Sequence, residues 1–442
     1  MEMNLRVKLI LALHIATLLF NLSEVFGVER FPPPDFEPGT YTMPSPTKPA
    51  ARAHYWEYVD MFLLVAALSL ASYFALGKRS RRHIFWLTLF SIFYFGFIRQ
   101  GCVCPIGSIQ NVTLALFNNN YTVPLSVMFF FLVPLIFTLF FGRTFCAAVC
   151  PLGAIQDIVV WKPIKIKPWI EKALRTIPFI YLGLALLFAA TGSAFIICEY
   201  DPFISFYRLG GSVGMLTLGG VFLLVGMFVG RPYCRFICPY GAILSLLSRI
   251  SKWNVYLTGE DCVRCQICDV ACPYGAIATP TPESQQQQKG SFSIGSALAL
   301  ILITIALVVG GAAGGGKLSV AFSKMNKTVS LAEQMAAEES GKVKIQSTDE
   351  TKAFREKGGS IDELYAEALK IRGKFAFGCS IFGGFVGLVI GLKLIGARFA
   401  TEQSIYEPDR ASCVACGRCY AYCPKEIIRV RNLQKANAKK KQ

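Results

Sequence analysis

The segments CVRCQICDVACP, residues 262–273, and CVACGRCYAYCP, residues 413–424, share the cysteine spacing C-x₂-C-x₂-C-x₃-C-P. This is the bacterial spacing for 4Fe–4S clusters, in which three close thiolates bind one cluster and the fourth, before the proline, binds the other. The rule predicts two ligand sets: Cys262, Cys265, Cys268 and Cys423, and Cys413, Cys416, Cys419 and Cys272. The alternatives are two zinc sites or a disulfide framework, but a zinc site closes on four ligands without needing a reciprocal copy. The spacing therefore indicates one-electron chemistry.

The composition indicates a membrane protein. Of 442 residues, 53% are hydrophobic, and the mean hydropathy of +0.46 is higher than that of a soluble domain. The net charge of +17 does not indicate nucleic acid, because the basic residues gather in short loops between apolar runs. A lipid bilayer is the expected partner, and the basic tail at 435–441 is either solvated or in weak contact with anionic lipid. Sixteen cysteines in these patterns favour metal ligation in a reducing compartment.

Seven apolar runs have about the length that a bilayer core requires. They lie at about 59–77, 83–99, 123–141, 177–198, 213–230, 293–313 and 375–396. Basic residues in the loops near 78–82 and 143–175 put those loops, and both cysteine-rich segments, on the inner side. The sequence thus predicts a mainly α polytopic membrane protein of about seven transmembrane helices. A small cytoplasmic α+β ferredoxin-like 2×4Fe–4S module, split by a helical hairpin, completes the predicted fold.

The predicted boundaries follow from these runs. Residues 1–27 are expected to be a signal peptide or an uncleaved N-terminal anchor, and 28–58 a Pro-rich outer linker. The remaining parts are a five-helix membrane domain (59–258), the first ferredoxin half (259–280), a linker (281–292), a transmembrane hairpin (293–396) with an outer helical segment (317–374), and the second half with a basic tail (397–442). In the last span, Gly383, Gly387 and Gly391 form a close-packing face for a neighbouring helix.

An internal repeat contains four further cysteines. GRTFCAAVCPLGAIQ at 142–156 matches GRPYCRFICPYGAIL at 230–244, each at the inner end of a predicted span. Residues at i and i+4 share one face of a helix, so each repeat would present two thiols together. Side by side, the two repeats would offer a membrane-edge cluster site at Cys146, Cys150, Cys234 and Cys238. The alternative is that these cysteines only help to pack helix ends.

The last four cysteines fall on the outer side in this topology. They are Cys102 and Cys104 in GCVCPIGSIQN, Cys198, and Cys379. Four ligands would make a fourth, outer cluster. A disulfide from Cys102 or Cys104 to Cys198 is the alternative, and Cys379 among glycines is typical of helix packing.

The repeated CxxxCP motif followed by the ferredoxin-like module resembles the NosR/NapH family of polytopic membrane iron–sulfur proteins, over roughly 59–280 and 413–424. The resemblance implies electron transfer between cytoplasmic or quinone donors and periplasmic reductases. The ligands it implies are the CxxxCP cysteines and the eight ferredoxin cysteines given above. The chain differs from the NosR type, since 28–58 is too short for a periplasmic flavin domain, and from the shorter NapH type, which lacks the hairpin at 290–396.

These observations favour an electron-transfer subunit of a membrane redox complex in the bacterial inner (cytoplasmic) membrane, with its module in the cytoplasm. Its expected partners are other subunits and a periplasmic redox protein. One alternative is a quinone oxidoreductase subunit whose outer cysteines are only structural, with Glu199 and Asp201 as candidate groups near a quinone. Another is a redox-sensing assembly protein, although no output domain is visible in the sequence.

Overall fold

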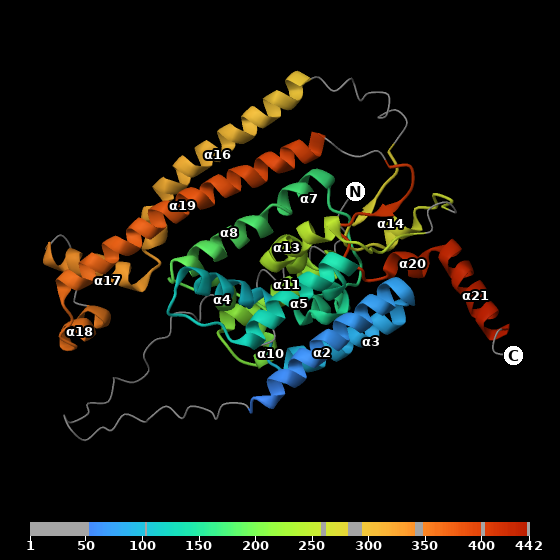
Figure 1. The fold of residues 1–442 in the computed structure, drawn as a ribbon, viewed down its shortest axis with the longest axis horizontal. Helices are drawn as coiled ribbons and strands as arrows, with labels where there is room; N and C mark the ends of the chain where they lie inside the picture. Colours follow the sequence, from blue (N-terminus) through green and yellow to red (C-terminus); the bar gives the residue numbers. More distant parts are fainter. Residues whose placement is uncertain are drawn as a thin grey trace, which may run out of the picture. The chain divides into compact units, whose positions relative to one another are not determined.

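The computed structural model describes residues 53–101, 104–257, 262–281, 294–340, 348–398 and 403–439, and within them helices dominate (Figure 1). The mainly α class is therefore confirmed. The predicted signal peptide or anchor at 1–27, most of the linker at 28–58, all but the first residue of the linker at 281–292, and Cys102 lie outside the described residues.

The elements of the first half form the bundle that carries the CxxxCP repeats. In chain order they are α2 (Tyr55–Ser72), η2 (Tyr73–Gly77), α3 (Arg81–Ser91), η3 (Ile92–Ile98), α4 (Pro105–Phe117), α5 (Leu125–Phe141), η4 (Phe145–Val149), α6 (Pro151–Ile158), α7 (Pro168–Leu174), α8 (Ile177–Ala190), α9 (Ile196–Glu199), α10 (Ile204–Arg208), α11 (Val213–Phe228), α12 (Pro232–Phe236), α13 (Pro239–Leu247) and η5 (Ser248–Ile250).

The second half contains the ferredoxin-like segments and the hairpin between them. Its elements are α14 (Ile267–Ala271), β1 (Ile277–Ala278), α16 (Ile294–Ser323), α17 (Lys327–Glu339), α18 (Asp349–Glu356), α19 (Ile361–Arg398), β2 (Glu407–Pro408), α20 (Arg418–Tyr422) and α21 (Pro424–Lys439).

Four helical stretches in the described residues are long and apolar enough to cross a membrane: Tyr55–Gly77, Pro168–Ala190, Gly295–Ser323 and Ile361–Arg398. The shorter apolar helices Leu125–Phe141 and Val213–Phe228 coincide with two more of the predicted spans. The predicted span at 83–99 is α3 continued by the π-helical η3, and its first turn contains Arg81 and Arg82. Seven spans therefore stay a prediction.

The hairpin consists of two long helices, α16 and α19, that run side by side (Figure 1). A Cβ atom at Gly383 would collide with the carbonyl of Gly311, and one at Gly387 with the carbonyl of Leu307. The prediction that this glycine face packs against a neighbouring helix is confirmed, and the neighbour is α16. The outer segment differs from its predicted bounds: α16 continues to Ser323, and α19 begins at Ile361 as one helix with the following span.

The two ferredoxin-like segments come together although the hairpin separates them in the sequence. Strands β1 and β2 pair antiparallel, with Ile277 opposite Pro408. Helix α14 of the first segment packs on α20 of the second, and the amide of Asp409 donates to the carbonyl of Ala276 at 2.7 Å. One small α+β unit is thus assembled from both ends of the insertion.

Candidate functional site

Each CxxxCP repeat folds as a short turn, a break and a new helix. In the first repeat, η4 ends at Val149, Cys150 is extended, and α6 begins at Pro151. In the second, Cys238 precedes α13, which begins at Pro239. Proline suits the first helical position because its missing N–H would be unpaired there anyway. The second cysteine of each repeat therefore caps the next helix, and the expectation that both thiols share one helix face is wrong.

The two repeats nevertheless bring their four thiols to one place. Cys146, Cys150, Cys234 and Cys238 line a single small cavity with about 300 Å³ of empty space. Two of the sulfur atoms accept hydrogen bonds, from the amide of Gln156 to Cys234 at 3.3 Å and from the backbone N–H of Gly241 to Cys238 at 3.3 Å. Such donors stabilise a thiolate and tune the potential of a cluster that it binds. We call these cysteines site three.

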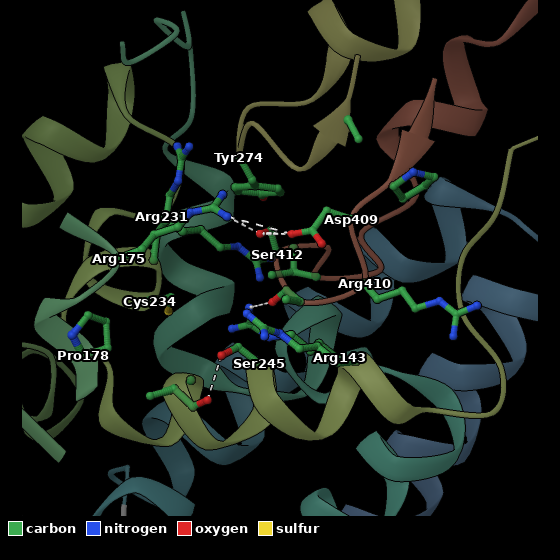
Figure 2. Close-up of a pocket in the computed structure, with 18 of the residues that line it drawn as sticks. Arg143, Arg175, Pro178, Arg231, Cys234, Ser245, Tyr274, Asp409, Arg410 and Ser412 are labelled. Atoms are coloured by element: carbon green, nitrogen blue, oxygen red, sulfur yellow. Dashed lines mark hydrogen bonds and ion pairs between the residues drawn. The ribbon is translucent and has the colours of Figure 1, made fainter. Parts of the chain in front are cut away.

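The arginine of each repeat, Arg143 or Arg231 (both labelled in Figure 2), packs against a glycine of the other repeat. Arg143 Nη2 lies 3.4 Å from where a Cβ would stand at Gly241, and Arg231 Nη1 lies 3.4 Å from the same position at Gly153. A side chain at either glycine would press on the opposite arginine. Arg143 also approaches Cys146 Sγ at 3.8 Å. The Gly-Arg motif of each repeat therefore packs against the Gly-Ala-Ile motif of the other repeat, next to site three.

The second predicted ferredoxin set also surrounds one cavity. Cys272, Cys413, Cys416 and Cys419 line about 320 Å³ of empty space together with Val255 and Tyr274. Cys416 and Cys419 are buried, and burial raises the pKa of the Cys413 thiol to about 12. The N–H of Ala276 donates to Cys272 Sγ at 3.4 Å. We call these cysteines site two.

The first predicted ferredoxin set is gathered at a more open position. Burial, with a smaller contribution from the neighbouring thiols of Cys262, Cys265 and Cys423, raises the pKa of Cys268 to about 11. Cys268 is buried, whereas Cys265 is exposed and Cys262 is half-buried. These four cysteines form site one, which is the one of the three with a ligand at the surface.

The chemistry of the donor sets fits an iron–sulfur cluster. Each set offers four thiols, which are the donors that 4Fe–4S clusters use. At sites two and three the four cysteines line one cavity each. Within the described ranges, no group of three His, Cys, Asp or Glu side chains is arranged to hold a single metal ion. Burial raises the pKa of Cys234 to about 12. The free thiol is therefore neutral, and an iron cluster would displace its proton on binding.

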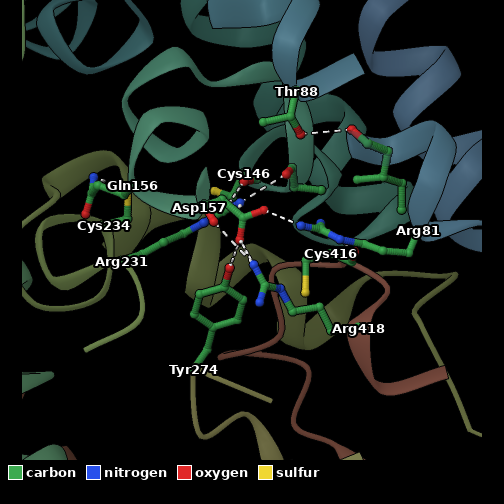
Figure 3. A network of polar contacts seen from close by, with 12 residues as sticks. Arg81, Thr88, Cys146, Gln156, Asp157, Arg231, Cys234, Tyr274, Cys416 and Arg418 are labelled. Atoms are coloured by element: carbon green, nitrogen blue, oxygen red, sulfur yellow. Dashed lines mark hydrogen bonds and ion pairs between the residues drawn. The ribbon is translucent and has the colours of Figure 1, made fainter. Parts of the chain in front are cut away.

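A buried carboxylate, Asp157, connects sites two and three (Figure 3). It accepts from Arg81 Nη2 at 2.6 Å and from Arg418 Nη2 at 3.2 Å, and it lies 3.6 Å from Arg231 Nη2. Tyr274 donates its hydroxyl to the same carboxylate.

Two arginines of this network also contact the backbone of cysteines in sites two and three. Arg81 Nη1 donates to the carbonyl of Cys416 at 3.0 Å, and Arg231 Nη1 donates to the carbonyl of Cys146. Cys146 also packs against the small core that contains Cys416. Three arginines face one carboxylate here, and the negative charge of thiolate-bound clusters would offset the excess.

Sequence reasoning missed Asp157, Tyr274 and the arms from Arg81 and Arg418. The Gly-Arg pair shared by the two repeats did indicate that Arg143 and Arg231 lie near the cysteines. Asp157 directly follows the first repeat, and the equivalent position after the second repeat is Ser245. Comparison of the two repeats therefore did not identify Asp157 as a site residue.

The predicted outer cysteines are only partly brought together. Cys104 and Cys198 are neighbours beside the buried Asp201, where burial raises the pKa of that carboxyl to about 6. Cys379 instead lies within α19, with its carbonyl against Gly315 of α16. Glu199 is exposed, whereas Asp201 is buried and donor N–H groups of Phe203 and Ile204 face it.

Comparison with known proteins gives matches over the repeat region. A family model described as a 4Fe–4S binding domain matches residues 123–177 and 212–257, which contain the four site-three cysteines. YccM of Escherichia coli (strain K12), named as a candidate electron transport protein, is 27% identical over 115 residues, which are 24% of this chain and 32% of YccM. The uncharacterized protein MJ0750 of Methanocaldococcus jannaschii is 31% identical over 104 residues, 24% of this chain and 43% of the relative.

A third relative is the protein NirI of Paracoccus denitrificans, which is 30% identical over 96 residues, 21% of this chain and 14% of NirI. The chain spans less than half the length of each of these curated relatives. No solved structure matches. The resemblance to the NosR/NapH group of membrane iron–sulfur proteins is confirmed by the domain match together with YccM and NirI.

Proposed function

We propose that the protein is a membrane-bound electron relay with three 4Fe–4S clusters, one at each of sites one, two and three. One observation carries the proposal: all twelve cysteines predicted from motif spacing fall into three groups of four thiols. The 4Fe–4S domain match over site three and the electron-transport name of YccM support the same chemistry.

The proposed path runs from site one through site two to site three, or the reverse. Site one has an exposed ligand and suits exchange with a soluble partner. Sites two and three are adjacent, because Cys146 packs against the core around Cys416. The basic loops favour a cytoplasmic position for sites one and two, in the bacterial inner membrane. A periplasmic redox protein and other subunits complete the proposal, with a site at Cys104 and Cys198 as the candidate outer contact.

The test is the iron and acid-labile sulfide content of anaerobically purified full-length protein, with EPR of the reduced sample. Three clusters predict about twelve iron per chain, by four iron per cubane. The double variant Cys146→Ala/Cys234→Ala should then fall to about eight. Cys379→Ala, a buried cysteine of α19 outside the three sites, is the matched control and should keep about twelve. About eight iron in the unsubstituted protein would contradict a cluster at site three, and about sixteen would add an outer one.

A specific cavity favours quinone exchange as a second candidate function. It has about 1800 Å³ of open space, and its aromatic lining includes Tyr73, Phe141 and Trp253. Val255 lines both this cavity and the cavity of site two, so a quinone head would lie beside that cluster. This location differs from Glu199 and Asp201, the candidates from sequence.

Reduction by decylubiquinol, followed in the EPR spectrum, tests the quinone candidate. We expect Trp253→Ala to slow reduction several-fold if a quinone binds here, because the substitution removes an aromatic surface of the cavity wall. The ring centroids of Trp253 and Phe141 lie 5.4 Å apart in a stacked arrangement. The exposed Trp169 provides the control, Trp169→Ala. Equal rates in both variants would leave the relay without a quinone site at this cavity.

A further inference from the structure

A basic cavity adjoins site three, and Cys234 of that site is part of its lining. It has about 1460 Å³ of open space, and we call it the arginine pocket (Figure 2). The cations in its lining come from six different segments of the chain: Arg143, Arg175, Arg231, Arg235, Arg249, Arg410 and Lys393. Two carboxylates, Glu407 and Asp409, line it as well.

The inner cations are partly neutralised. Arg175 and Arg235 both pair with Glu171, and Arg231 pairs with Asp157. Arg175 also lies 4.0 Å from Asp409. Even so, the buried Nε–H groups of Arg143, Arg231 and Arg235 have no hydrogen-bond partner among the described residues. Buried donors of this kind normally have a partner, so the inner wall has unused capacity for an acceptor.

Two other cations of the lining are less neutralised. Arg249 and Lys393 make no ion pair with any residue that the structure describes, although Asp409 lies within electrostatic reach of Lys393. Lys393 Nζ lies 5.6 Å from the centroid of the Phe179 ring. Arg410 extends to the side (Figure 2), toward the neighbouring aromatic cavity, which it also lines. Positive charge in the lining therefore exceeds negative charge.

Part of the lining comes from two helical stretches that are candidates to cross the membrane. Lys393 belongs to the last turns of α19, while Arg175, Pro178 and Phe179 belong to the stretch Pro168–Ala190. Pro178, Phe179 and Ala242 add apolar surface to a lining rich in arginine. A ligand with an anionic head and an apolar continuation would match both features of this lining.

From these observations we propose that the arginine pocket binds a phosphate group, and that its source is the headgroup of an anionic phospholipid. Guanidinium groups bind phosphate oxygens through paired, charge-assisted hydrogen bonds. Basic pockets between membrane helices, close to the headgroup level, bind anionic lipid heads in the same way. The phosphate would accept hydrogen bonds from the unpaired N–H groups of the inner wall, and the glycerol part of the lipid would lie against Phe179.

The experiment titrates detergent-solubilised full-length protein with dioctanoyl phosphatidylglycerol, dioctanoyl phosphatidylcholine and inorganic phosphate, and reads bound ligand by native mass spectrometry. The test variant is Arg249→Gln/Lys393→Gln, whose residues lie outside the cluster sites. The control, Lys317→Gln/Lys352→Gln, removes the same charge from exposed positions elsewhere. The variant Arg249→Lys/Lys393→Arg keeps the charge and should restore binding. Iron content, measured on every sample, shows that each variant is folded and is independent of the result for lipid.

We expect phosphatidylglycerol to bind the unsubstituted protein and the control alike, and the test variant about tenfold or more weakly. Competition by inorganic phosphate would support phosphate recognition. Variant-dependent binding of inorganic phosphate without any preference for phosphatidylglycerol would keep the phosphate site and assign it to a soluble anion. Equal affinity of test variant and control for every ligand, or equal binding of phosphatidylcholine and phosphatidylglycerol, would overturn the proposal.

Discussion

Sites one and two come from the same pair of motifs and differ in their surroundings. Site one includes the exposed Cys265 and the half-buried Cys262. Site two has two buried ligands, a closed cavity and the arms of a charged network. The cysteine spacing is thus the same in both motifs, while the rest of the fold determines the burial and the hydrogen bonding of each site.

In the proposed relay, this difference would separate the cluster that exchanges electrons with a partner from the clusters that pass them on. An exposed cluster can meet a partner directly, whereas a buried one is shielded and has its potential set by nearby hydrogen bonds and charges. Site three resembles site two in this respect, because its sulfur atoms accept from Gln156 and Gly241. The following predictions test that contrast, from the largest expected effect to the smallest.

Ligand removal should have different consequences at the two sites. Cys265→Ala and Cys416→Ala should each remove about four iron. Only Cys416→Ala should also loosen the pairing of the two ferredoxin-like segments, because metal binding at an enclosed site is coupled to folding. Limited proteolysis between residues 403 and 424, with iron analysis, checks this. Equal protection of both variants would contradict the contrast.

Loss of the central carboxylate should destabilise the enclosed sites strongly. Asp157→Asn leaves three arginines around a neutral amide, which should cost about 3–5 kcal/mol of unfolding free energy, as expected for a broken buried ion pair. Glu333→Gln is the control, since Glu333 pairs with Lys324 and Arg372 at half-exposed positions. Such pairs contribute about 0–1 kcal/mol. Urea unfolding in detergent measures both changes, and a similar cost for the two would refute the role of the network.

Acid should weaken the same network. Burial alone would raise the pKa of Asp157, but Arg231, Arg81 and Arg418 outweigh it and hold that pKa well below its usual range. A depressed carboxyl pKa stabilises the fold fully above the unfolded value of 3.8, and the stabilisation is lost as pH falls below it. Unfolding midpoints should therefore drop below about pH 4 in the unsubstituted protein, and this acid step should be smaller in Asp157→Asn. A parallel pH profile in the variant would show that another group is responsible.

The smallest expected difference between site one and the other two sites is the rate of reaction with a water-soluble oxidant. Ferricyanide, a soluble oxidant, should oxidise the reduced cluster of site one several-fold faster than those of sites two and three, because only site one has a ligand at the surface. Stopped-flow absorbance combined with freeze-quenched EPR resolves the order. A single common rate would mean that the clusters equilibrate faster than they react, and the comparison would then be repeated in Cys416→Ala.

The sequence predicts which cysteines line a common cavity at sites two and three, because spacing along the chain and an internal repeat restrict which cysteines can meet. It predicts the glycine face of α19 for the same reason. That the cysteines bind clusters stays a prediction. Asp157 was missed because its partners, Arg81, Tyr274 and Arg418, come from three distant segments without any shared spacing. The break at Cys150 was also missed, because the i, i+4 spacing of Cys146 and Cys150 suggests one continuous helical turn, whereas Pro151 begins a new helix.

The insertion of α16 and α19 between the two ferredoxin-like segments has a consequence for biogenesis. During synthesis, the chain that ends before residue 413 offers three of the four ligands of site one and a single ligand of site two. In the proposed relay, neither cluster would be complete until the whole hairpin has been made and β2 has paired with β1. Iron loading at sites one and two would then depend on the correct folding of the hairpin.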